Sequence, residues 1–161
     1  MAGRATAMIL AAGRGERLRP LTDALPKPLV EVAGKPLVVR QIEALARAGH
    51  RDIAINASWL AQMLVDALGD GGAWGVRLHW SIEPEPLETG GGIATARPLI
   101  ADGPVLVVSA DIWTAYDYAL LDRLRPNVDA ARGHRVHLVM VPNPPYHPKG
   151  DFALDAAHGH G

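Results

Sequence analysis

Cysteine is absent from the sequence, and its absence excludes a disulfide framework, a thiolate zinc site and a cysteine nucleophile. An excess of charge is also lacking, because 16 basic residues face 17 acidic ones. No bulk field therefore draws the chain to nucleic acid or to an anionic membrane. The N-terminus lacks a long hydrophobic run, since only residues 7–12 are continuously apolar. We expect a soluble, cytoplasmic protein that binds anions through local groups, and nothing in the sequence indicates its oligomeric state.

The 161 residues, of which 48% are hydrophobic, suffice for one domain with an ordinary core. Short apolar runs alternate with amphipathic segments along the chain. They predict strands at residues 5–10, 53–55, 76–82, 105–109 and 136–141, and helices at residues 36–48, 58–68, 89–99 and 117–124. We expect Gly49 to end the first helix and Ser58 to cap the second. The pattern is typical of a Rossmann-like α/β domain over residues 1–161, with a mixed, mostly parallel sheet sandwiched by helices.

The end of the chain carries a further expectation. Residues 150–154 read as a strand and residues 155–161 as a turn, so a hairpin would lack its second strand. A lone edge strand leaves its hydrogen-bonding groups unpaired. We therefore expect this chain to be a C-terminally truncated piece of a longer domain.

A glycine-rich turn follows the first predicted strand. Gly13 and Gly15 would let the backbone approach a phosphate closely, because glycine has no β-carbon and tolerates positive φ. A dinucleotide fingerprint would need a third glycine where Leu18 stands, which disfavours an NAD-dependent oxidoreductase. A Walker loop ending at residues 34–36 fails too, because Lys35 is followed by proline and position 29 is leucine. A simple strand-to-loop turn remains open for a glycine pair taken alone.

Basic residues favour the phosphate-binding interpretation of this turn. Arg14, Arg17, Arg19 and Lys27 all follow the first predicted strand within fourteen residues of Gly13. Fixed cations beside a glycine loop are what a nucleoside triphosphate, with about four negative charges, requires.

The same segment resembles the signature of the sugar-1-phosphate nucleotidyltransferases. The similarity lies in Leu-Ala-Ala-Gly-Arg-Gly-Glu-Arg-Leu-Arg-Pro-Leu-Thr at residues 10–22 and Pro-Lys-Pro-Leu at residues 26–29. The resemblance implies the nucleotide-diphospho-sugar transferase fold and catalytic roles for Arg17 and Lys27. It also implies that the loop holds the nucleotide through Ala11, Ala12, Gly13 and Gly15.

Asp111 comes directly after the apolar run at residues 105–110. In parallel sheets, ligands bind at the carboxyl ends of the strands, so this carboxylate is expected near the glycine loop. A lone aspartate after a strand is as readily a turn residue, but beside phosphates it suits Mg²⁺. The resembled family has its metal aspartate here, with Ala110 replacing the usual glycine.

Residues 83–93 form a second segment with two interpretations. Alone, they read as a proline-rich turn capped by Thr89. By resemblance they bind the nucleotide, through Glu83, Glu88, Thr89 and Gly90, and Glu83 stands where many members have a base-reading glutamine. The Leu-Glu-Thr-Gly-Gly-Gly form at residues 87–92 is most similar to the N-acetylmuramate-1-phosphate uridylyltransferases.

Residues 141–152 resemble the sugar-side loop of that subgroup. The resemblance implies sugar binding by Asn143, Gly150 and Asp151, although the two polar residues could equally serve in turns. Residues 56–60, Asn-Ala-Ser-Trp-Leu, also fit the subgroup, and we expect Trp59 to pack at a helix start rather than to contact a ligand.

The function expected from the resemblance is transfer of a nucleotidyl group, using UTP, Mg²⁺ and N-acetylmuramate-1-phosphate, with a role in cell-wall peptidoglycan recycling. The open alternatives are a glucose-1-phosphate thymidylyltransferase, a mannose-1-phosphate guanylyltransferase, and a nucleotide-sugar-binding module without catalysis. The family has a second metal aspartate near the end of the catalytic domain, and no residue up to Gly161 can be assigned to it.

Overall fold

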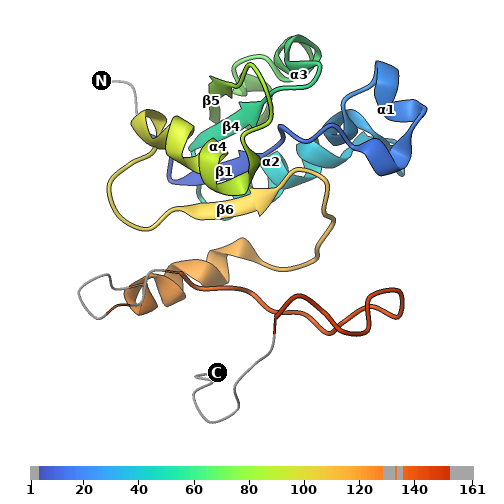
Figure 1. Cartoon of the computed structure of the whole chain (residues 1–161). Helices are drawn as coiled ribbons and strands as arrows, with labels where there is room; N and C mark the ends of the chain where they lie inside the picture. The colour runs from blue at the N-terminus through green and yellow to red at the C-terminus, as the bar shows by residue number, and fades with distance from the viewer. Residues whose placement is uncertain (1–3, 129–132, 134–135, 153–161) are drawn as a thin grey trace. The chain divides into compact units, whose positions relative to one another are not determined.

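The computed structural model describes residues 4–128, 133 and 136–152. The chain divides into two compact units, Met1–Pro126 and Asn127–Gly161, and each is described by itself. Figure 1 shows the first unit as a sheet with helices on its two faces. The single domain expected over residues 1–161 stays a prediction.

The central sheet of the first unit has four strands in the order β5-β4-β1-β6. Their bounds are Ala7–Leu10 for β1, Asp52–Ala57 for β4, Arg77–Ile82 for β5 and Leu106–Ser109 for β6. All three pairings are parallel, so the predicted parallel sheet is confirmed. In the register, Leu10 of β1 faces Asn56 of β4 and Ser109 of β6. The three strands therefore end together at one edge.

The strand residues alternate between two hydrophobic clusters, as the pleat of a strand requires. One cluster contains Ile9 and Ile55, with residues of α2 (Leu37–Arg47) and α3 (Ala61–Leu68). The other contains Met8, with Ala96 of α4 (Glu88–Ala96). Continuous apolar strands are thus explained by burial on both faces.

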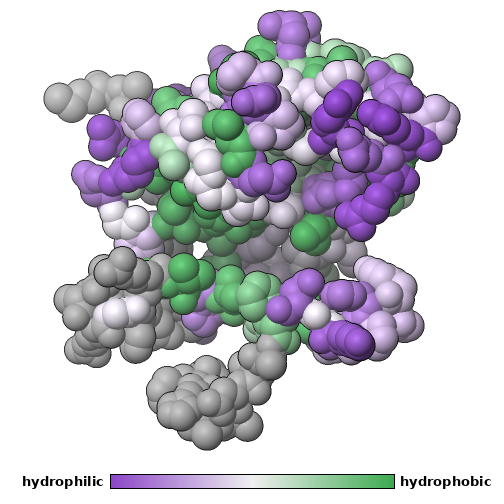
Figure 2. Space-filling model, viewed as in Figure 1, coloured by the Kyte–Doolittle hydropathy of each residue, from purple (hydrophilic) through white to green (hydrophobic). Residues whose placement is uncertain are grey.

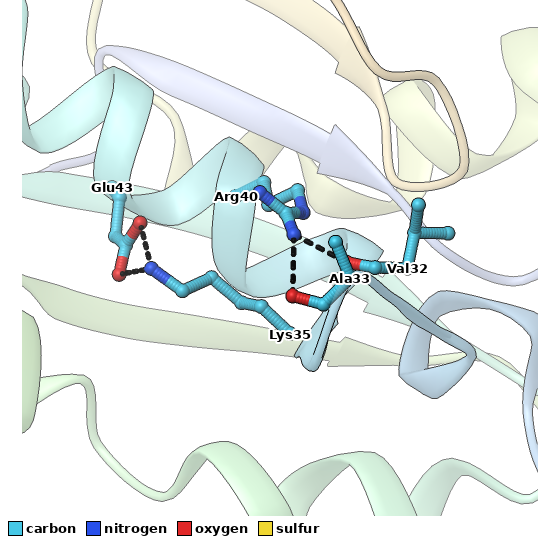
Figure 3. A network of polar contacts seen from close by, with 5 residues as sticks. All are labelled: Val32, Ala33, Lys35, Arg40 and Glu43. Atoms are coloured by element: carbon cyan, nitrogen blue, oxygen red, sulfur yellow. Dashed lines mark hydrogen bonds and ion pairs between the residues drawn. The ribbon is translucent and has the colours of Figure 1, made fainter.

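A short hairpin that the sequence did not predict joins the glycine-loop region to α2. Its strands are β2 (Glu31–Val32) and β3 (Lys35–Pro36). Its turn residues, Ala33 and Gly34, both have positive φ, as a type I′ hairpin turn requires. Figure 3 shows how α2 holds it: Lys35 donates to both oxygens of Glu43 at 2.7 and 2.8 Å, and Arg40 donates to the hairpin carbonyls. The other short elements are η1 (Glu16–Leu18), α1 (Leu21–Ala24), η2 (Lys27–Leu29), η3 (Gly72–Trp74), η4 (Arg97–Leu99) and η5 (Tyr118–Asn127).

Several helix ends differ from the sequence expectations. The predicted cap at Ser58 is wrong, because α3 begins at Ala61 after Leu60, whose φ is 52°, and no side chain caps it. Thr89 does not cap α4 either, since that helix already begins at Glu88. Residues 118–127 form a 3₁₀ rather than an α-helix. Gly49, with φ of 95°, follows α2 as expected.

The second unit corrects another expectation. The strand predicted at residues 136–141 is wrong, because this segment has no regular structure. A strand needs a neighbour to accept its backbone hydrogen bonds, and no ladder in the described residues reaches it. Residues 150–152 are not in a strand either, and the rest of the strand predicted there, residues 153–154, lies outside the described residues. Within the described ranges, no helix is long and apolar enough to cross a membrane.

We predict that Ile55→Ala lowers the free energy of unfolding by about 2 to 5 kcal/mol, because it empties a fully buried position at the centre of the sheet. Urea unfolding followed by circular dichroism measures this loss. Val32→Ala, at a residue that is 47% exposed, is the control and should cost far less. Equal costs would show that β4 does not carry the core.

Asp52, the first residue of β4, supports a second prediction. Arg77 donates to both carboxylate oxygens at 2.8 and 2.9 Å, and His79 lies 2.9 Å away. The hydrogen bond from Arg77, helped by His79, holds the pKa of Asp52 below its usual value. The stabilisation is therefore present above the unfolded pKa and lost as pH falls through the folded one. Below about pH 4, the wild type should lose more stability than Asp52→Asn, as acid titrations of unfolding would measure; parallel curves would contradict this assignment.

Candidate functional site

A hollow of about 400 Å³ lies at the carboxyl edge of the sheet, where β1 and β6 end side by side. The edge continues past the strands, because the Ala110 N–H donates to the Leu10 carbonyl at 3.0 Å. Both the glycine loop and the segment after β6 contribute to its walls. The lining residues are Leu10, Ala11, Gly13, Gly15, Glu16, Arg17, Lys27, Pro28, Ser109, Ala110 and Asp111.

The hollow brings together two residues that the sequence singled out separately. The Lys27 ammonium forms an ion pair with the Asp111 carboxylate, 84 residues along the chain. Their side chains are 23% and 34% exposed, so solvent weakens the pair, and it contributes little to stability. The structure thus holds a cation and a carboxylate at the wall of an open hollow, where both can meet a ligand.

The two loop glycines have different reasons to be glycine. Gly15 has a φ of +68°, and a β-carbon there would lie 2.9 Å from the Lys27 β-carbon and 3.0 Å from the Thr22 methyl group. The Thr22 hydroxyl also donates to the Gly15 carbonyl at 2.8 Å. Gly13 is exposed, with open space around it. Gly15 therefore packs against Lys27, whereas Gly13 leaves backbone open to the hollow.

Two arginines of the loop are engaged with neighbouring side chains, whereas a third lines the hollow. Arg14 lies over the ring of Trp59, 4.3 Å from its centroid, and Arg19 pairs with Asp23 at 3.1 Å. The Trp59 ring in turn donates to the Thr22 carbonyl at 2.9 Å. Arg17 lines the hollow and has no ion-pair partner within the described residues. Figure 2 shows how strongly hydrophilic the surface around α1 is.

A second hollow, of about 160 Å³, adjoins the first and shares Leu10 and Gly13 with it. Four residues predicted to bind nucleotide line it, namely Ala12, Gly13, Glu88 and Thr89. Gly90 is exposed beside them but does not line the hollow. The full lining is Leu10, Ala12, Gly13, Asn56, Pro86, Glu88 and Thr89.

Glu83, for which the resemblance implies nucleotide binding, is buried among protein partners. Its side chain is 2% exposed, and both carboxylate oxygens are engaged within the protein. One accepts from the Asn56 amide at 2.8 Å, and the other accepts from the Leu87 N–H at 3.1 Å. The Asn56 carbonyl oxygen accepts from the Ala11 N–H at 2.9 Å. The carboxylate therefore faces the protein interior.

The sequence interpretation gave no site role to Asn56, which lines the second hollow and is 3% exposed. The available indication was a polar residue inside the otherwise apolar run of β4. A buried polar side chain requires partners, so this position predicts a contact without revealing which one.

The residues predicted to bind the sugar all lie in the second unit. A β-carbon on Gly150, whose φ is +61°, would collide with the Asn143 carboxamide. Asn143 donates to the Pro148 carbonyl at 3.1 Å, and Asp151 lies 3.2 Å from the His147 ring nitrogen. These contacts fold a local turn, and the part of these residues in the site stays a prediction.

The donors available to a metal are few. No group of three or more His, Asp or Glu side chains converges within the described residues. Asp111 is the carboxylate at the end of β6, and the exposed Glu16 also lines the hollow. Magnesium is commonly held by one or two carboxylates together with substrate phosphates, so this donor set fits Mg²⁺ when phosphates supply the remaining oxygens.

Comparison with known proteins gives consistent results. The profile of a family described as nucleotidyl transferase matches residues 6–148. The chain is 50% identical to N-acetylmuramate alpha-1-phosphate uridylyltransferase of Neisseria meningitidis serogroup B, over 92% of this chain and 64% of that protein. It is 40% identical to mannose-1-phosphate guanyltransferase of Schizosaccharomyces pombe, over 81% of this chain and 34% of that protein. The crystal structure of HddC from Yersinia pseudotuberculosis, complexed with GMP-PN, aligns with a TM-score of 0.65 at 31% identity, over 73% and 52% of the two chains. The chain thus spans less than two thirds of these relatives.

A side chain at position 15 would be disfavoured both by the left-handed backbone and by close contacts with its neighbours, and the two effects can be separated experimentally. Gly34→Ala is a matched control, because Gly34 has a φ of +69° and open space around it. We expect Gly34→Ala to cost about 1 kcal/mol for the left-handed backbone alone. Gly15→Ala should cost about 1 to 3 kcal/mol more, because the added methyl group meets Lys27 and Thr22. Urea unfolding of both variants measures the difference, and equal costs would contradict the close packing around Gly15.

Proposed function

Since the chain belongs to the nucleotidyl transferase family, we propose that it joins a nucleoside triphosphate to a sugar-1-phosphate and releases pyrophosphate. The observation that supports this proposal is the meeting of Lys27 and Asp111 in a hollow of about 400 Å³ beside the Gly13 backbone. A cation, a carboxylate and open main chain are what two phosphorylated reactants require.

In the proposed reaction, an oxygen of the sugar-1-phosphate attacks the α-phosphorus of the triphosphate. A new oxygen–phosphorus bond forms while the bond from the α-phosphorus to the bridging oxygen breaks, and its electron pair leaves with pyrophosphate. Nothing is oxidised or reduced. The nucleophile is already an anion, so the protein needs to provide neither a base nor a covalent intermediate, and its task is positioning and charge neutralisation.

The chain's own groups divide this task. The exposed Gly13 backbone would let the triphosphate approach, and Arg17 would bind its phosphate oxygens from the wall of the hollow. Lys27 would reduce the repulsion between the two anionic reactants, and it would stabilise the charge that builds up at the α-phosphate.

Asp111 would hold Mg²⁺. When bound, the ion supplies positive charge to the phosphate oxygens and lowers their mutual repulsion. With Asp111 holding the ion, the Lys27 ammonium would be free to contact the phosphates in the same hollow. The Lys27–Asp111 pair of the ligand-free chain would thus keep each group in place until its ligand arrives.

For the reactants, we propose UTP and N-acetylmuramate-1-phosphate, because the uridylyltransferase relative is 50% identical to this chain over 149 aligned residues. This choice implies a role in the recycling of cell-wall peptidoglycan. Asn143, Gly150 and Asp151 would contact the sugar. The relation to mannose-1-phosphate guanyltransferase, at 40% identity, makes GTP with mannose-1-phosphate the second pair to test.

We predict that Lys27→Ala lowers kcat for pyrophosphate release by roughly 100-fold or more, because it removes a charge aimed at the reacting phosphates. The assay should offer UTP, dTTP, GTP and CTP with N-acetylmuramate-, glucose- and mannose-1-phosphate. Lys35→Ala is the matched control: it breaks a surface pair with Glu43 (Figure 3) and should leave turnover unchanged.

Circular dichroism should show both variants folded. Wild-type turnover in Lys27→Ala would refute the assigned role. Nucleotide binding by the wild type, without pyrophosphate release for any pair, would instead identify a binding module.

A further inference from the structure

A buried chain of hydrogen bonds lies behind the second hollow and connects the ends of three strands. It runs from the Ala11 N–H to the Asn56 side chain, then to Glu83, and ends at the Leu87 N–H. Asn56 is the fifth residue of β4, and Ala11 and Glu83 directly follow β1 and β5. We call these two side chains, Asn56 and Glu83, the clamp.

The donor and acceptor roles in this series of hydrogen bonds are fixed at both ends. A backbone N–H can only donate, so Asn56 must turn its carbonyl oxygen to Ala11 and its amide group to residue 83. Residue 83 must then accept from Asn56 on one side and from the Leu87 N–H on the other. A carboxylate can accept at both oxygens, whereas a glutamine presents only one. The structure therefore explains why glutamate occupies position 83.

Helix α4 packs closely against the two side chains of the clamp. A β-carbon on Gly92 of α4 would lie 2.6 Å from the Asn56 amide nitrogen and 2.9 Å from a Glu83 oxygen. The helix therefore lies directly against both side chains. Burying a carboxylate is costly even when it is hydrogen-bonded, so a gain in stability is a poor reason for this arrangement.

We propose that Asn56 and Glu83 are positioning residues, which fix the loop after β1 relative to the start of α4 and so shape the hollow that receives the nucleoside. The hollow lies between these two segments, with Ala12 and Gly13 on one side and Glu88 and Thr89 on the other. The nature of the ligand rests on the proposed function. Glu83 itself does not touch the nucleotide, because both of its oxygens are engaged with Asn56 and Leu87.

Exchanging the donor and the acceptor between positions 56 and 83 provides the test. Glu83→Gln leaves one amide group facing another donor, and Asn56→Asp sets two carboxylates against each other. Combining Asn56→Asp with Glu83→Gln restores every donor–acceptor contact, because the carboxylate at position 56 accepts from Ala11 and from the new amide, whose carbonyl accepts from Leu87. The double variant has the same net charge and number of heavy atoms as the wild type.

We expect each single variant to raise the KM for the nucleotide about tenfold or more, through an unpaired buried group that shifts the loop. The double variant should recover to within about threefold of the wild type. The kcat should change far less, because Lys27 and Asp111 remain in place. Calorimetric titration with UTP and Mg²⁺ measures binding without turnover. Glu31→Gln, the same change at an exposed residue of β2, is the control and should have no effect.

Amide hydrogen exchange at Ala11 and Leu87 gives a readout that needs no ligand. Protection should fall in the single variants and return in the double variant. Unchanged binding in the single variants, or a double variant as weak as the singles, would overturn the proposal while leaving the transferase function intact. Recovered protection in a chain that binds no nucleotide would reduce the clamp to a structural role and refute the proposed function.

Discussion

The parallel pairing of β1 with both β4 and β6 is the constraint on which the site depends. Because Leu10 lies level with Asn56 and Ser109, the chain leaves all three strands at one edge of the sheet. The glycine loop, the clamp and Asp111 are therefore brought together by the strand register, without further contacts between them being required. They lie together because each follows, or ends, a strand of this sheet, which is the usual location of ligand sites in open α/β folds.

Two kinds of polar contact at this edge have opposite physical characters. The Lys27–Asp111 pair is partly exposed, so water screens it and a ligand can exchange for either partner at modest cost. The clamp is buried, and breaking any of its hydrogen bonds leaves a polar group without a partner. The first arrangement suits groups that must change partners during a reaction. The second suits groups that must hold the surrounding loops in place.

The sequence predicted the fold better than it predicted the contacts. The continuous apolar run at residues 5–10 specifies a strand covered on both faces. The run at residues 105–109 also forms a strand, but it is half-buried at the end of the four-stranded sheet. The same reasoning failed for residues 136–141, where an apolar run found no partner in a described ladder. The cap at Ser58 failed because its carbonyl, rather than its hydroxyl, bonds to the start of α3. The Lys27–Asp111 contact joins residues 84 apart, so sequence spacing could place each residue near the edge but could not pair them.

The family resemblance and the geometry give different roles to Glu83. By resemblance, this position reads the base. By geometry, position 83 needs a side chain that accepts hydrogen bonds, because the Ala11 N–H donates to Asn56 and so makes the Asn56 amide a donor towards it. An inward-facing carboxylate cannot discriminate between bases directly. If the second hollow receives the base, discrimination must come from its shape and from the groups that line it, such as Pro86, Glu88 and Thr89. A glutamine at position 83 would need either a loop without the Leu87 contact or a side chain turned out towards the ligand, which is a different way of building the same pocket.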